Sequence, residues 1–159
     1  MGFVLDSAYP ASSVFFLGDK DTDCGSDCSG SYWLAEDKKT SGQGFIIKLH
    51  SCQRWISGVQ IKNKGNGYDR QCLTKDFRVS GSTTQNGPWE ILVEAELEDT
   101  TNKDATLLNF TFAETKLIRF LKFDLVSYWG SSGGGLQYFA AIPVTGTFFA
   151  LEIIIAFVV

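Results

Sequence analysis

Apolar and polar side chains alternate on both sides of a turn-forming segment, residues 80–88, which ends in Asn-Gly-Pro. Before it, Phe77 and Val79 fall on one side of the chain and Asp76 and Arg78 on the other. After it, Trp89, Ile91, Val93, Ala95 and Leu97 share one side and Glu90, Glu94, Glu96 and Glu98 the other, with Leu92 as the exception. Successive side chains leave a β-strand on opposite faces, so this pattern predicts two adjacent strands with one wet face and one dry face.

Shorter runs predict the remaining strands. Residues 45–49 and 59–61 alternate on either side of a short connector, and we predict that they form a hairpin. The other predicted strands are residues 12–17, 108–112, 117–126 and 135–144. Residues 117–126 are apolar on both faces, which predicts a central strand with a bulge near Phe120, or a strand covered on both sides. Pro143 predicts an edge or a strand end.

About eight strands separated by turn signals, with no convincing helical period, predict an all-β fold, an antiparallel jelly-roll β-sandwich. The length of 159 residues suits one domain, which we place at residues 1–145. The net charge of −4, with no run of Lys or Arg, argues against a nucleic-acid partner.

An apolar segment follows this domain in the sequence. Residues 148–159 read FFALEIIIAFVV, and we separate residues 146–159 as a tail. A bilayer-spanning helix needs about 17–25 residues. The tail is therefore a truncated anchor, through which the protein would associate with a membrane, an artefact of the gene model, or a packed strand or helix. Residues 1–5 are too short for the charged and apolar regions of a signal peptide.

Four segments in order give the chain a resemblance to a known family. They are SYWLAEDKKTSGQGFIIKL at residues 31–49, GVQIKNKGNGYDRQCLTKDFRVSGS at 58–82, GPWEIL at 87–92 and RFLKFDLVSYWGSSGGGLQYF at 119–139. Together they resemble the coagulation factor 5/8 type C, or discoidin-like, domain over residues 3–144. The resemblance implies a galactose-binding-like sandwich, a non-catalytic extracellular module that binds glycans, lipid head groups or proteins through loops at one end. Many members join their two ends by a disulfide, whereas this sequence has no Cys from residue 144 onward.

Two loops combine aromatic rings with hydrogen-bonding groups that suit a glycan. The candidate ligand-binding residues are Asn66, Tyr68 and Arg70 in the first loop and Tyr128 and Trp129 in the second. An aromatic ring stacks on the apolar face of a sugar, while Arg or Asn bonds its hydroxyl groups. The alternative is that these side chains brace their own loops.

An acidic loop is a candidate calcium site. Asp19, Asp21 and Asp23 alternate along it, and alternating carboxylates offer the oxygen ligands that calcium takes. The resemblance implies a calcium ion in this first loop, although relatives often close the site with a late Glu where this chain has Gln137. The alternative is a solvated acidic loop without a metal.

Four cysteines are present: Cys24, Cys28, Cys52 and Cys72. In the predicted hairpin, Cys52 and Cys72 lie a strand length apart, whereas a disulfide needs Cα atoms within about 7 Å. We therefore favour pairing each of them with Cys24 or Cys28, in an order that the sequence leaves open, and this implies an oxidising compartment. Zinc is the alternative, with His50 nearby, but the C-x3-C spacing is not that of a zinc finger.

Catalytic interpretations find little support in the sequence. His50 is the only histidine, and no G-x-S-x-G motif accompanies it. The glutamates from Glu90 to Glu98 lie on one face of one strand, whereas a glycosidase needs two carboxylates facing each other across a cleft.

We therefore predict a non-enzymatic recognition module, extracellular or at the cell surface, that binds carbohydrate through its loops. The alternatives are a protein-binding adhesion or structural domain and an accessory domain of a larger enzyme. Asn109 begins the sequon Asn-Phe-Thr, which is a glycosylation site if the chain is secreted.

Overall fold

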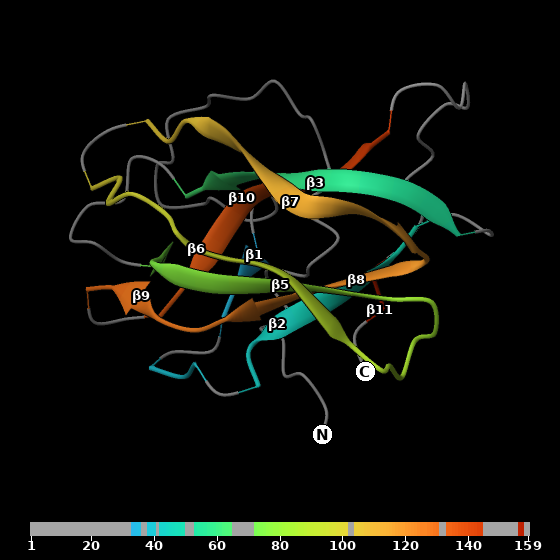
Figure 1. Cartoon of the computed structure of the whole chain (residues 1–159). Helices are drawn as coiled ribbons and strands as arrows, with labels where there is room; N and C mark the ends of the chain where they lie inside the picture. The colour runs from blue at the N-terminus through green and yellow to red at the C-terminus, as the bar shows by residue number, and fades with distance from the viewer. Residues whose placement is uncertain are drawn as a thin grey trace.

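The alternating segments form strands that assemble into two antiparallel sheets (Figure 1). This computed structural model describes residues 33–35, 38–40, 42–49, 53–64, 72–101, 104–130 and 133–144, and the backbone of residues 156 and 157. The four-stranded sheet has the order β1 (Trp33–Leu34), β10 (Gly135–Pro143), β3 (Arg54–Asn63), β7 (Leu107–Ile118). The five-stranded sheet has the order β11 (Ala156–Phe157), β2 (Gly44–Lys48), β8 (Phe120–Leu125), β5 (Asp76–Ser82), β6 (Glu90–Glu96). A small third sheet pairs β4 (Leu73–Thr74) with β9 (Tyr128–Trp129).

Every strand pair is antiparallel, and the described part of the chain contains no helix. The predicted all-β sandwich is therefore confirmed. No helix among the described residues has the length and apolar character to cross a bilayer.

Aromatic side chains fill the space between the two sheets. Phe123 on β8 is fully buried, and its ring centroid lies 5.2 Å from Phe45, 5.7 Å from Trp33 and Phe77, and 5.9 Å from Phe139. Phe139 and Trp33 come from the four-stranded sheet, and the other rings from the five-stranded sheet. Four of the thirteen Phe in the sequence, together with Trp33, thus join the two layers through their large flat rings.

The hairpin predicted from residues 45–49 and 59–61 is wrong. β2 pairs with β8 and β11, whereas β3 lies between β10 and β7 in the other sheet. The chain therefore passes from one layer to the other between Lys48 and Arg54. Local alternation identifies a strand that is buried on one face, but it does not identify the strand's partner.

The predicted pairing of residues 75–80 with residues 89–97 is confirmed as β5 with β6, but its dry face differs from the prediction. Val93 lies opposite Val79, and the next pair is Ile91 with Ser80, so Leu92 is an extra residue on β6. Such a bulge reverses the alternation beyond it. Leu92 consequently packs against the core, while Ile91 is 53% exposed.

Glu94 and Glu96 on β6 and Glu98 just after it are exposed, as predicted for the wet face. Glu90 is also exposed, but beyond the bulge it lies opposite Gly81, on the side of the sheet that faces β7. Glu94 lies 2.6 Å from Arg78 Nε on β5, and Glu90 lies 2.8 Å from Lys116 Nζ on β7. The hydrogen bond from Lys116 to Glu90 raises the pKa of the Lys116 ammonium above its usual value. These carboxylates serve as partners of surface cations and do not face each other across a cleft.

The single strand predicted at residues 117–126 is two strands. β7 extends the predicted segment 108–112 as far as Ile118, the chain turns at Arg119, and β8 begins at Phe120 in the other sheet. The bulge expected near Phe120 is therefore this change of layer. β8 is central, as predicted, between β2 and β5, and Pro143 ends β10.

The two ends of the sequence lie largely outside the described residues. The strand predicted at residues 12–17 is among the residues that the structure does not describe. In the tail, the backbone of β11 pairs with β2, with Ala156 opposite Ile47 and Phe157 opposite Ile46. The boundary between a domain at residues 1–145 and a tail remains a prediction.

Gly58 lets β3 and β7 approach closely. A Cβ atom added at this position would lie 2.4 Å from the carbonyl oxygen of Phe110 on β7. Because backbone cannot yield as a flexible side chain does, we expect Gly58→Ala to lower the free energy of unfolding by roughly 1–3 kcal/mol or more. Thermal unfolding measures this loss. Ser57→Ala is the control, and it removes one 3.2 Å hydrogen bond to the Ile142 carbonyl at a cost of about 1 kcal/mol; a smaller loss for the glycine variant would contradict the close approach.

Candidate functional site

Several loops meet at one end of the sandwich, on the side of β9 in Figure 1. We call this end the rim and define it as residues 63–64, 72–75, 97–101 and 127–130. It includes the end of β3, the segments that follow β6 and precede β5, and the pair β4–β9, in which Leu73 lies opposite Trp129 and Thr74 opposite Tyr128. The predicted loop that carries Tyr128 and Trp129 thus contains a short strand, β9, which pairs these two residues with β4.

Of the five predicted ligand-binding residues, Tyr128 and Trp129 lie at the rim. Both are half-buried, and Tyr128 also packs against the core. Asn66, Tyr68 and Arg70 lie outside the described residues. They belong to the segment between Lys64 and Cys72, both of which are at the rim, but the structure gives no position for these three side chains.

Trp129 is held on two sides. Its Nε1–H donates a 3.0 Å hydrogen bond to the carbonyl of Leu97, and the ammonium of Lys75 lies 4.9 Å from the indole centroid. A cation over an aromatic face is attracted by the ring's electron density. Trp129 is therefore an oriented indole whose apolar surface is partly covered, and Lys75 adds a positive charge beside it.

Asn63 connects the loops of the rim. The residue is 3% exposed, and its Nδ2 donates hydrogen bonds of 2.9 Å to the Thr74 carbonyl and 3.3 Å to the Glu98 carbonyl. Its Oδ1 accepts hydrogen bonds of 3.1 Å from the backbone N–H groups of Lys64 and Thr74. One buried amide thus uses all of its donors and two acceptor positions to join β3, β4 and the segment after β6.

Two buried threonines extend this network. Thr74 Oγ1 donates a 2.9 Å hydrogen bond to the Gly135 carbonyl at the start of β10, and Thr100 Oγ1 donates a 2.5 Å hydrogen bond to the Lys64 carbonyl. Both threonines are fully buried. Each satisfies a backbone carbonyl that would otherwise be costly to bury. The rim is therefore built as a rigid, hydrogen-bonded platform.

The turn that carries β9 is fastened to β5. The backbone N–H groups of Val126 and Ser127 donate to the Asp76 carbonyl at 2.9 and 3.0 Å. Ser127 Oγ accepts a 3.2 Å hydrogen bond from the Asp76 N–H and donates to the Asp76 carboxylate. Asp76, which sequence reasoning assigned only to the wet face of its strand, therefore fixes the position from which Tyr128 and Trp129 project.

The remaining sequence candidates lie mostly outside the described residues. Asp19, Asp21, Asp23, Cys24, Cys28, Cys52 and His50 all fall there. Cys72 is half-buried with a positive φ of 61°, and Gln137 is half-buried on β10. Over the ranges that the structure describes, no three His, Cys, Asp or Glu side chains cluster in a way that could hold a metal ion.

Sequence reasoning missed Asn63, Lys75, Thr74 and Thr100. The signal for Asn63 was weak, since an asparagine at the end of a strand commonly lies in a turn. Its role depends on groups up to 35 residues away along the chain. Aromatic character in the sequence thus identifies Tyr128 and Trp129, whereas the residues that hold them in place are identified only by contacts in the folded structure.

No protein-family model matches the sequence, and no curated protein matches it. Solved structures share its fold. One is CBM32-1 from a family 31 glycoside hydrolase of Clostridium perfringens, with a TM-score of 0.60 and 15% identity over 89% of this chain and 90% of that one. Another is the family 32 CBM of C. perfringens NanJ in complex with galactose, with a TM-score of 0.55 and 16% identity over 86% of this chain and 87% of that one. The chain therefore shares the β-sandwich fold of these two solved structures.

Proposed function

We propose that this protein is a non-catalytic carbohydrate-binding module that captures its glycan at the rim. The observation that supports the proposal most directly is the oriented indole of Trp129, held by Leu97 and Lys75 on a platform that Asn63 makes rigid. Stacking on a sugar needs a fixed aromatic ring, and a fixed ring loses little conformational entropy on binding. The shared fold adds to this, because one structure with the same sandwich was solved with galactose.

Membership of the coagulation factor 5/8 type C family and an extracellular location belong to the same proposal. Both are supported by the four ordered sequence segments and by the sandwich that they form. Calcium held by Asp19, Asp21 and Asp23 is a further part of it, and glycan titrations with added calcium and with a chelator test this part separately.

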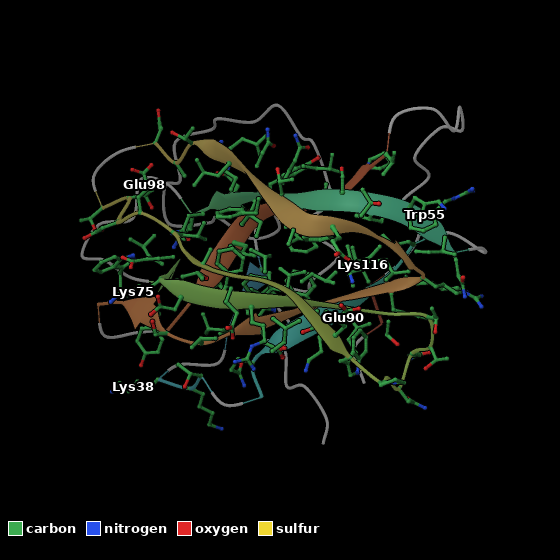
Figure 2. All side chains as sticks on the ribbon, in the orientation of Figure 1. Lys38, Trp55, Lys75, Glu90, Glu98 and Lys116 are labelled. Carbon is green, nitrogen blue, oxygen red and sulfur yellow. The ribbon has the colours of Figure 1, made fainter. Side chains whose placement is uncertain are left out.

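Glycan binding is tested by Trp129→Ala, with Trp55→Ala as a matched control. Trp55 is 52% exposed at the opposite end of β3, a ten-residue strand that spans about 30 Å, and Figure 2 shows it far from Lys75 and Glu98. We expect Trp129→Ala to weaken the binding of a galactose-containing glycan at least tenfold, or about 1.4 kcal/mol, by calorimetric titration. Trp55→Ala should leave the affinity unchanged.

Trp129→Phe distinguishes the contribution of ring stacking from that of the hydrogen bond that anchors the indole. It keeps an aromatic ring but removes the N–H that donates to Leu97, so we expect an intermediate affinity. Failure of the unaltered protein to bind any sugar on a glycan array, with or without calcium, would refute the proposed function. Equal losses of glycan affinity in Trp129→Ala and Trp55→Ala would show that the rim is not the binding site.

A protein-binding adhesion domain is the second candidate, and one observation favours it. Trp55 and Leu117 lie opposite each other on β3 and β7 and are 52% and 40% exposed. Exposed apolar neighbours of this size occur at protein interfaces. Under this alternative, Trp55→Ala abolishes partner binding while Trp129→Ala does not, which is the reverse of the pattern expected for a glycan.

A further inference from the structure

The one N-glycosylation sequon in the sequence, Asn109-Phe110-Thr111, lies on the exposed strand β7. Asn109 and Thr111 are both exposed, while Phe110 between them points inward and packs on Phe77 at 5.0 Å between ring centroids. Side chains two residues apart in a strand share a face. The acceptor amide and the hydroxyl of the sequon therefore both stand on the outer face of the four-stranded sheet, where a bulky group disturbs no core contact.

The two ends of the Asn109 amide have different surroundings. Its Oδ1 accepts a 3.1 Å hydrogen bond from Nε2 of Gln60, its register partner on β3. Nδ2, the atom that carries the sugar in an N-linked glycan, makes no hydrogen bond within the described part of the chain. A glycosylated asparagine keeps its carbonyl, so the contact with Gln60 survives and holds the first sugar in a defined direction.

β7 is an open edge of its sheet. Among the residues that the structure describes it pairs only with β3, it is 12 residues long, and Leu107 at its start is 43% exposed. Leu107 lies on the same face as Asn109, about 7 Å away along the strand. A long edge strand with unpaired backbone groups and exposed apolar side chains is a template for association with other chains, unless something covers it.

We propose that Asn109 carries an N-linked glycan when the protein passes through a secretory compartment, and that this glycan covers the open edge of β7. The co-reactant is an oligosaccharide joined to a lipid through a diphosphate. A bond forms between Nδ2 and the anomeric carbon of the oligosaccharide, the bond from that carbon to the diphosphate breaks, and the diphosphate leaves with the electron pair. Nδ2 releases one proton. This inference is independent of what the rim binds.

The modification is tested on the full chain behind a cleavable secretion signal, expressed in eukaryotic cells. We expect one discrete mass increase on the secreted protein, removed by peptide N-glycosidase with conversion of Asn109 to Asp. Asn109→Gln and Thr111→Val should both lack the increase, while Thr111→Ser, which keeps the sequon, should retain it. Thr115→Val, an exposed threonine on the same strand, is the control and should retain it as well. Secreted protein without the mass increase would overturn the proposal.

Coverage of the edge is tested by association in solution. We expect the glycosylated protein to remain monomeric by light scattering at concentrations where Asn109→Gln, which lacks the glycan and adds no charge to the edge, associates. Leu107→Lys, which places a charge on the same edge, should reduce that association in the Asn109→Gln protein. Equal behaviour of the glycosylated protein and Asn109→Gln would overturn the protective role while leaving the modification in place.

Discussion

Phe123→Ala is expected to lower the free energy of unfolding by about 3–5 kcal/mol. Phe123 has no exposed surface, and its ring contacts four other aromatic rings, two in each sheet. Removing it leaves a cavity between the layers that the flanking strands cannot close, because β8 is central and paired on both sides with β2 and β5. A loss of this size is a large part of the roughly 5–15 kcal/mol that stabilises a typical domain.

Urea unfolding followed by tryptophan fluorescence measures this loss, since Trp33 lies 5.7 Å from Phe123. Phe110→Ala is the matched control: it makes the same deletion at a half-buried ring that touches only Phe77 among the aromatic contacts of the described residues. We expect it to cost less than half as much. Equal costs for the two variants would mean that Phe123 is not the centre of the core.

The strands that sequence reasoning placed correctly are those whose partner follows closely along the chain. β5 and β6 are joined by a short turn, and their alternation is long enough to identify both strands and their pairing. β2 and β3 have equally clear alternation and an equally short connector, yet they belong to different sheets. The preference of β2 for β8, more than 70 residues later, comes from the packing of Phe45 against Phe123 and Trp33. The alternation within one strand does not identify such long-range contacts.

The wrong assignment of Ile91 and Leu92 to the two faces of β6 also results from contacts with another strand. Ile91 and Leu92 are both apolar, and a strict period of two places Ile91 inside. The bulge that exchanges them is fixed by the pairing of Ser80 with Ile91, next to Gly81, where an added Cβ would lie 2.7 Å from a Leu92 methyl group. The space left by a glycine on the neighbouring strand thus decides which apolar residue enters the core.

For the candidate site, residue chemistry identified Tyr128 and Trp129 but not the groups that hold them. An indole in a glycine-rich loop is a recognisable candidate in sequence, because aromatic rings in loops are suited to ligands. Its fixed orientation depends on Leu97, 32 residues earlier, and on Lys75. The platform beneath it depends on Asn63, whose importance appears only when all four of its hydrogen bonds are seen together.

Asn63→Leu is expected to destabilise the protein by about 3–5 kcal/mol, since four hydrogen bonds are lost at roughly 1 kcal/mol each and the buried N–H of Thr74 is left without its partner. We also expect the glycan affinity proposed for the rim to fall, because β4 carries β9 and with it Trp129. The affinity is measured well below the unfolding temperature. Gly58→Ala, which destabilises the sandwich away from this network, should leave the affinity intact.

Asn63→Asp introduces a carboxyl group without changing the size of the side chain, and it therefore tests the hydrogen bonds that the Asn63 amide donates. The new carboxylate keeps the acceptor for Lys64 and Thr74 but faces the carbonyl oxygens of Thr74 and Glu98, 2.9 and 3.3 Å from the replaced nitrogen. Burial and these two oxygens disfavour the charged form, so the pKa of the introduced carboxyl rises in the folded state. The folded protein then binds more protons than the unfolded chain, and stability must fall as pH rises from about 4 toward neutrality.

Asn109→Asp, at an exposed amide whose only hydrogen bond in the described structure is accepted by its oxygen, should show no such dependence. A flat difference in stability between Asn63→Asp and the unaltered protein across this pH range would show that the amide of Asn63 does not donate to the loops of the rim.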